Sequence, residues 1–79
     1  MITEEVFLAD LKDMLKAEEN IELDTDLMDI ESWDSFSMMA FISMAEEKYN
    51  AKFEPFAIAG AVLVEDLYNV VNDSLGRNE

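Results

Sequence analysis

The sequence of 79 residues contains no cysteine and no histidine, and both absences exclude chemistry. Without cysteine the chain forms no disulfide, no thiolate zinc site and no cysteine nucleophile. Without histidine it has no imidazole base and no imidazole metal ligand, so a catalytic triad built from its own residues is excluded. An enzyme that works unassisted is therefore the least favoured class of function.

Basic residues are scarce: five Lys and Arg stand against 19 Asp and Glu, which gives a net charge of −14. Proteins bind nucleic acid by neutralising phosphates with Lys and Arg, so we expect no nucleic-acid partner. Anionic membrane surfaces are disfavoured for the same reason. Partner proteins that carry basic patches are the ones this charge attracts.

Long hydrophobic runs are also missing. The longest apolar run covers the nine residues 56–64, well below the ~20 that a membrane-spanning helix needs. The first residues, Met1 to Glu5, include neither a basic region nor the apolar core of a signal peptide. We expect a soluble, monomeric protein of the cytoplasm that does not insert into membranes.

The apolar pattern predicts helices, because apolar residues recur every three or four positions and no stretch alternates with a period of two. The expected fold is all-α, a small four-helix bundle in a single domain over 1–79. Three main helices are predicted over 3–17, 35–49 and 64–75, with a short helix or turn over 56–61. The expected N-caps are Thr3 and Asp34, the expected helix ends are Asn50 and Gly76, and the solvated side of the first helix is expected to carry Asp10, Asp13 and Lys16.

Residues 18–34 carry eight acidic residues and no basic one, without sustained helical or strand periodicity. We interpret them as a long acidic loop that apolar anchors pin to the core, with a short turn near Leu27. Long loops in compact domains are commonly functional. Part of the acid pattern is similar to a calcium-binding EF-hand loop. The required glycine is missing, however, Met28 stands at the fifth position, and Ser35 stands where that loop needs a bidentate glutamate, so no specific metal site is predicted.

Asp34 and Ser35 are the residues best placed for chemistry. If Asp34 caps the second helix, Ser35 is its first residue, and its hydroxyl lies at the helix N-terminus beside the acidic loop. A phosphate on that oxygen would meet unpaired backbone N–H groups and the positive end of the helix dipole. The dipeptide alone is more often simply the start of a helix.

In this setting the chain resembles an acyl carrier protein over nearly its whole length. The family's Asp-Ser-Leu corresponds to Asp34-Ser35-Phe36, and its apolar-Pro step after the second helix is similar to Phe53-Glu54-Pro55. The family's second helix is apolar and ends in an acid pair, which corresponds here to Phe41, Ile42, Ala45, Glu46 and Glu47. The aromatic residue that follows the pair corresponds to Tyr49, and the valine that opens the last helix corresponds to Val64.

The resemblance implies a carrier with no catalysis of its own. A phosphopantetheinyl transferase would attach 4′-phosphopantetheine from coenzyme A to the Ser35 hydroxyl, and Asp34 would cap the helix and assist that transfer. The thiol of the attached group would hold acyl intermediates as thioesters for acyl-loading and acyl-processing enzymes with basic patches. A borrowed thiol accounts for the lack of cysteine.

Departures from the family pattern point to a specialised rather than a housekeeping carrier. Trp33 stands where the family usually has glycine, and Ser37 and Ala40 stand where acids are common. Partner recognition is expected to use Trp33, Phe36, Met38, Met39, Glu46 and Glu47. The apolar segment 56–63 lacks the acids that the family commonly has there. Three interpretations stay open for it: a buried helix, the wall of an acyl pocket, or a docking patch. The residues that would form the pocket wall or the patch are Phe56, Ile58, Ala59, Gly60 and Leu63.

Two other functions stay open at this point. An aminoacyl, peptidyl or D-alanyl carrier would be loaded by an adenylating enzyme, and an unmodified acidic adaptor would keep the fold without the attachment. The strong acidity favours an acyl carrier in fatty-acid-like, polyketide or other specialised acyl biosynthesis.

Overall fold

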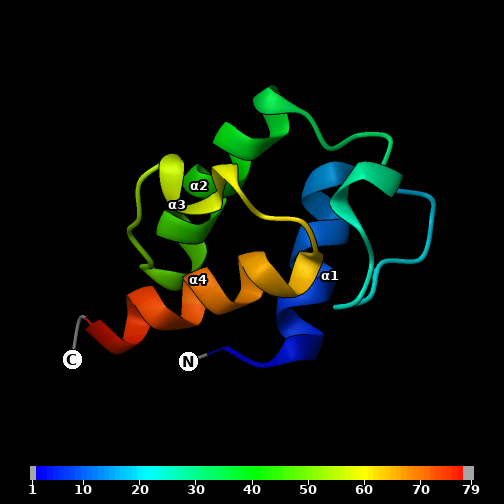
Figure 1. The fold of residues 1–79 in the computed structure, drawn as a ribbon. Coiled ribbons are helices and arrows are strands. Elements are labelled where there is room, and N and C mark those ends of the chain that lie inside the picture. Colours follow the sequence, from blue (N-terminus) through cyan, green and yellow to red (C-terminus); the bar gives the residue numbers. More distant parts are fainter. Residues whose placement is uncertain (1, 78–79) are drawn as a thin grey trace.

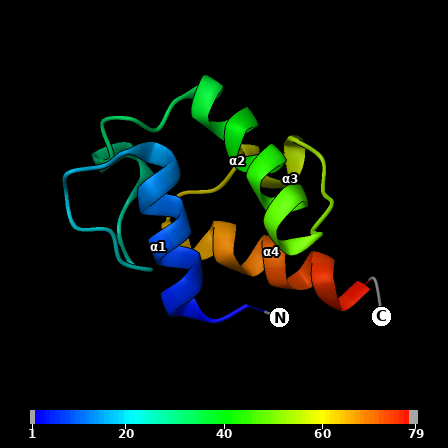
Figure 2. The same ribbon diagram turned by 180° about the vertical axis from the view of Figure 1, so that it is seen from behind.

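A computed structural model describes residues 2–77, and within that range all regular structure is helical apart from one isolated bridge between Asp26 and Leu63. In chain order the elements are α1 (Glu4–Leu15), a single 3-10 turn η1 (Leu27–Asp29), α2 (Ser35–Tyr49), α3 (Phe56–Ala59) and α4 (Val64–Arg77). The three longer helices pack together with short α3 beside α2 and α4 (Figures 1 and 2). The expected all-α four-helix bundle is confirmed.

Aromatic side chains fill the centre of the bundle. Phe41 of α2 and Phe7 of α1 are fully buried, and their ring centroids are 6.0 Å apart in an edge-to-face arrangement. The ring centroid of Phe41 also lies 6.2 Å from that of Trp33 and 6.0 Å from that of Phe53, and the ring centroids of Phe7 and Tyr68 are 5.2 Å apart. Edge-to-face and tilted aromatic pairs at this spacing add to the stabilisation from burial, so the two segments that flank α2 are held to the helix by one cluster.

The helix ends follow local capping chemistry, with two corrections. Thr3 accepts a hydrogen bond from the Val6 N–H at 3.2 Å and begins α1 as expected. The helix ends at Leu15, two residues before the predicted end, because Lys16 adopts the left-handed conformation with φ 52°. The prediction that Gly76 ends the last helix is wrong: α4 continues to Arg77, because Gly76 does not take the positive φ by which glycine usually stops a helix.

The acidic loop is anchored as predicted. Its side chains Ile21, Leu27 and Ile30 are buried in the core. Three backbone hydrogen bonds tie it to the start of α4 and to the residue Val62 before that helix. They run from Leu27 N–H to Val62 C=O at 2.9 Å, from Val64 N–H to Thr25 C=O at 3.0 Å and from Glu65 N–H to Leu23 C=O at 2.8 Å. The loop therefore has a defined path beside the start of α2, although eight acids repel one another along it.

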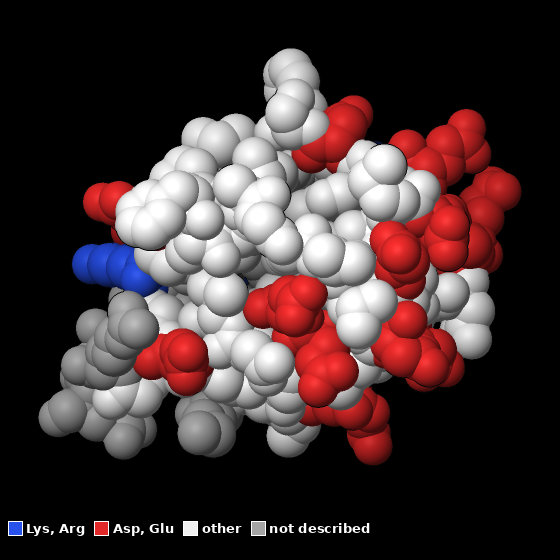
Figure 3. Space-filling model, viewed as in Figure 1, with Lys and Arg blue, Asp and Glu red and all other residues white. Residues whose placement is uncertain are grey.

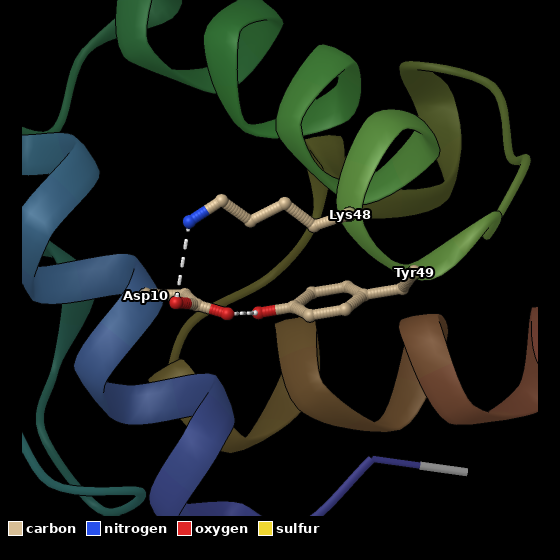
Figure 4. Close-up of polar contacts among 3 residues, drawn as sticks. All are labelled: Asp10, Lys48 and Tyr49. Carbon is tan, nitrogen blue, oxygen red and sulfur yellow. Dashed lines mark hydrogen bonds and ion pairs between the residues drawn. The ribbon is translucent and has the colours of Figure 1, made fainter.

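Asp10 corrects the prediction for the outer side of α1. Its carboxylate is half-buried and turned towards α2, where one oxygen accepts the Tyr49 hydroxyl hydrogen at 2.6 Å (Figure 4). The other oxygen lies 3.4 Å from Lys48 Nζ. Burial, and then the hydrogen bond to Asp10, raise the pKa of Tyr49. Asp10 thus joins the last turn of α2 to the middle of α1.

Acidic side chains gather over the loop and the beginning of α4, with few basic ones nearby (Figure 3). Mutual repulsion in this distribution opposes compaction. Adding NaCl or magnesium should therefore raise Tm, and a gain of about 1 kcal/mol corresponds to roughly 4–8 °C in a domain of this size. A scan of Tm against salt by circular dichroism tests this.

The control for that scan is the same titration near the isoelectric point of about 4.1, where the net charge vanishes and the rise should disappear. A Tm that is flat or falls with salt at neutral pH would contradict self-repulsion as a limit on stability.

Candidate functional site

Asp34 fixes the beginning of α2. Its backbone is extended, with φ −149° and ψ −173°, and its Oδ1 accepts the Ser37 N–H at 2.8 Å. The Asp34 carbonyl accepts the Met38 N–H at 2.9 Å, which closes the first helical turn. The predicted N-cap is confirmed, and Ser35 is the first residue of the helix as expected.

Ser37 completes the cap from the other side, a role that the sequence analysis missed. Its Oγ accepts the Asp34 N–H at 2.7 Å and donates to the Ser32 carbonyl at 2.8 Å. Asp34 and Ser37 together form a reciprocal capping box, in which each side chain satisfies the backbone N–H of the other. The signal in the sequence is Asp-x-x-Ser, with serine in place of the usual Glu or Gln at the third helical position.

The Ser35 hydroxyl stays outside this network. Ser35 is exposed, and none of the hydrogen bonds found among residues 2–77 involves its Oγ. By contrast, the Ser37 hydroxyl is engaged in the cap, and the Ser32 Oγ is buried without a partner. Of the three serines in 32–37, Ser35 is the one whose oxygen is open to reaction.

Two opposing electrostatic features meet at the first turn of α2: the carboxylate of Asp34 repels an anion bonded to Ser35, and the positive end of the helix attracts it. The Ser37 backbone N–H, and then the Ser37 hydroxyl, hold the pKa of the Asp34 carboxyl below its ordinary value. The first turn of α2 itself carries no acid, and its N–H groups point out at the positive end of a 15-residue helix. A primary alcohol at this position fits a phosphodiester-linked prosthetic group such as 4′-phosphopantetheine.

The residues predicted for partner recognition fall into two groups. Phe36 is 87% exposed and Met39 53% exposed on the first turns of α2, whereas Trp33 and Met38 are half-buried against the core. Glu46 and Glu47 are both exposed near the far end of the helix. The structure thus brings the aromatic and Met residues close to Ser35 and leaves this acid pair apart from it.

The segment 56–63 is only partly buried. Ile58 is 2% exposed and packs in the core, Leu63 is half-buried, and Phe56 is 77% exposed. The small residues Ala59 and Gly60 face outwards, and a Cβ added to Gly60 would meet no atom within 4 Å. Close packing of the chain therefore does not require glycine at this position.

Two other features limit what the site can be. Within residues 2–77, no three carboxylates lie close enough together to hold a metal ion. The helices of the same range lack the combined length and apolarity that a membrane crossing demands.

No protein-family model and no curated protein matches the chain. Among solved structures, the solution structure of the holo acyl carrier protein from Geobacter metallireducens is similar, with a TM-score of 0.80. The two sequences are 26% identical, and the similarity covers 99% of this chain and 91% of that one. The likeness therefore extends over all four helices and the long loop.

Removal of the second capping side chain should weaken the fold. Ser37→Ala is expected to lower the free energy of unfolding by about 1 kcal/mol, because the Asp34 N–H and the Ser32 carbonyl lose their partner. Urea titration followed by circular dichroism measures this. Ser43→Ala is the matched control: Ser43 is exposed on the same helix, and alanine there should leave stability unchanged or slightly higher. Equal losses in both variants would contradict the role of the cap.

The charge on Asp34 should matter at neutral pH and not in acid. Its folded-state pKa is lowered, so its stabilising contribution is present above the unfolded-state pKa and is lost as pH falls through the folded-state pKa. The amide in the variant Asp34→Asn does not titrate in this way. The urea midpoints of wild type and Asp34→Asn should therefore differ at about pH 7 and converge below about pH 4. A difference that is constant over this range would show that the ionised carboxylate adds nothing to the cap.

Proposed function

Because the chain belongs to the acyl carrier protein family, we propose that it carries acyl intermediates as thioesters on a 4′-phosphopantetheine arm attached to Ser35. The observation that supports this most is the exposed, unbonded hydroxyl of Ser35 at the capped N-terminus of α2. The attached group supplies a thiol, which a chain without cysteine does not have. The same domain carries no catalytic machinery and acts as a substrate of other enzymes.

The chain's own part in the attachment is small and specific. The Ser35 Oγ would lose its proton and become the bridging oxygen of a phosphodiester. The phosphoanhydride bond between the two phosphates of coenzyme A would break, and its adenosine 3′,5′-bisphosphate part would leave. Asp34 holds the first turn in place through the Ser37 N–H at 2.8 Å, so the backbone of Ser35 and the first N–H groups of α2 are already in position when the transferase binds.

Partners follow from charge and from the side chains near Ser35. We propose a phosphopantetheinyl transferase and acyl-loading and acyl-processing enzymes with basic patches, because a net charge of −14 attracts such surfaces. Trp33, Phe36, Met38, Met39, Glu46 and Glu47 are the residues assigned to recognition, and 56–63 contributes Phe56 as exposed apolar surface. We further propose a monomeric, specialised carrier that works in the cytoplasm.

Intact-protein mass spectrometry tests the attachment. After incubation with coenzyme A, magnesium and a broad-specificity phosphopantetheinyl transferase, the wild type should gain the mass of one phosphopantetheine group, and Ser35→Ala should gain none. Ser43→Ala keeps Ser35 and should be modified like the wild type. Both variants should keep the helical circular dichroism of the wild type, because neither hydroxyl contributes to the cap.

Two outcomes would contradict the proposal. Modification of Ser35→Ala would move the attachment to another hydroxyl. A wild type that stays unmodified with the broad-specificity enzyme and with the transferase of its own organism would favour an unmodified adaptor.

A further inference from the structure

Large side chains fill the interior that α2 enters after Ser35. An acyl chain tethered at Ser35 would enter the bundle along the inward side of that helix (Figure 1). This side presents the half-buried Met38 and then the fully buried Phe41 and Ala45. Phe41 follows Ser35 by six residues, about 9 Å along the axis at a rise of ~1.5 Å per residue. A chain that entered would therefore meet the Phe41 ring before it reached the middle of α2.

Other aromatic rings enclose Phe41. Its ring centroid lies 6.0 Å from that of Phe7, 6.2 Å from that of Trp33 and 6.0 Å from that of Phe53. These three rings come from α1, from the segment before α2 and from the segment after it, so they surround Phe41 from separate parts of the chain. Protein interiors are close-packed, and a ring that turns about only two side-chain bonds cannot fold aside as the flexible side chain of methionine does. An inserted alkyl chain would have to displace this cluster.

The small residues of segment 56–63 do not open another way in. One of them is half-buried, Ala61, and the others are exposed, namely Ala57, Ala59 and Gly60. The side chain that α3 turns into the core is Ile58, at 2% exposure, and Leu67 of α4 is fully buried in the same core cluster. The inner sides of α3 and α4 thus carry branched aliphatic side chains, and the small side chains of α3 lie on its outer side.

We infer that this carrier holds short acyl groups outside its helices, and that Phe41 excludes a long alkyl chain from the bundle. The inference deepens the proposed function and rests on it, because the acyl group is the one carried on the Ser35 arm. An alkyl chain held outside the helices keeps its apolar surface in water, at a cost that grows with every CH₂ group. Acyl groups with few carbons have little such surface, so they are the cargo that this interior suits.

A series of acyl groups of increasing length tests the inference on the wild type. A broad-specificity phosphopantetheinyl transferase with acetyl-, hexanoyl- and decanoyl-coenzyme A would give carriers that differ only in the acyl chain, and intact-protein mass spectrometry verifies each. A chain that entered the core would stabilise the folded state, as does any group that binds the folded chain alone. The Tm of the wild type should instead change by less than about 2 °C across the series. The NMR signals of the Ile58 and Leu67 methyl groups should also stay in place.

The variant Phe41→Leu should admit the longer chains. Leucine keeps the position apolar but removes the ring, and apolar space in a core takes up apolar ligands. From acetyl to decanoyl the Tm of this variant should rise by about 4 °C or more, and the Ile58 and Leu67 methyl signals should shift. Phe7→Leu is the matched control, because Phe7 is equally buried in the same aromatic cluster but leaves Phe41 in place. Its Tm should not depend on chain length, and circular dichroism verifies that both variants are folded.

The outcomes separate this inference from the proposed function. A wild-type Tm that climbs with chain length, together with shifted Ile58 and Leu67 signals, would overturn the inference and leave the carrier function standing. Equal behaviour of Phe41→Leu and Phe7→Leu, whether both respond to chain length or neither does, would overturn the role of Phe41. A wild type that accepts no acyl-phosphopantetheine group would remove the proposed function, and the inference with it.

Discussion

The reciprocal hydrogen bonds between Asp34 and Ser37 are the constraint on which the site depends. Each side chain satisfies the backbone N–H of the other, at 2.8 and 2.7 Å, and so the pair decides at which residue the helix begins. With that start fixed, Ser35 is the first helical residue, and its hydroxyl has no role within the fold. If the helix began one residue later, Ser35 would become the cap and its hydroxyl would be occupied by a backbone N–H.

Hydrogen bonds from backbone N–H groups to carboxylates also hold the long acidic loop in place. A net charge of −14 works against compaction, and the chain counters it with buried anchors and with carboxylates that accept backbone N–H groups. Asp66 illustrates this: its Oδ2 accepts the N–H groups of Val62 and Leu63 at 2.9 and 3.0 Å, which lowers its pKa. This fixes the segment to which the loop is bonded. The acids that remain free to meet a partner are those, such as Asp29, that no such bond engages.

Local patterns predicted most of the architecture. Apolar spacing gave the helices, and the Asp34 cap and the Ser35 hydroxyl followed from rules that act over a few residues. The helical conformation of Gly76 was not foreseen, because a glycine stops a helix only where the backbone needs a positive φ. The bond between Asp10 and Tyr49 joins residues 39 apart in the chain, so no local pattern carries it. The uneven exposure of segment 56–63 could not be predicted for the same reason, because it depends on which of its side chains are covered by α4 and the loop.

Amide hydrogen exchange across the first turn of α2, followed by NMR, tests the central claim that the cap sets the helix start and leaves Ser35 free. The account predicts slow exchange of the Ser37 and Met38 N–H groups, which Asp34 accepts through its carboxylate and its carbonyl. The Ser35 N–H should exchange much faster, because the first N–H of a helix has no partner within it. Exchange of Ser37 as fast as that of Ser35 would show that the cap does not form, and it would contradict the account of how this site is built.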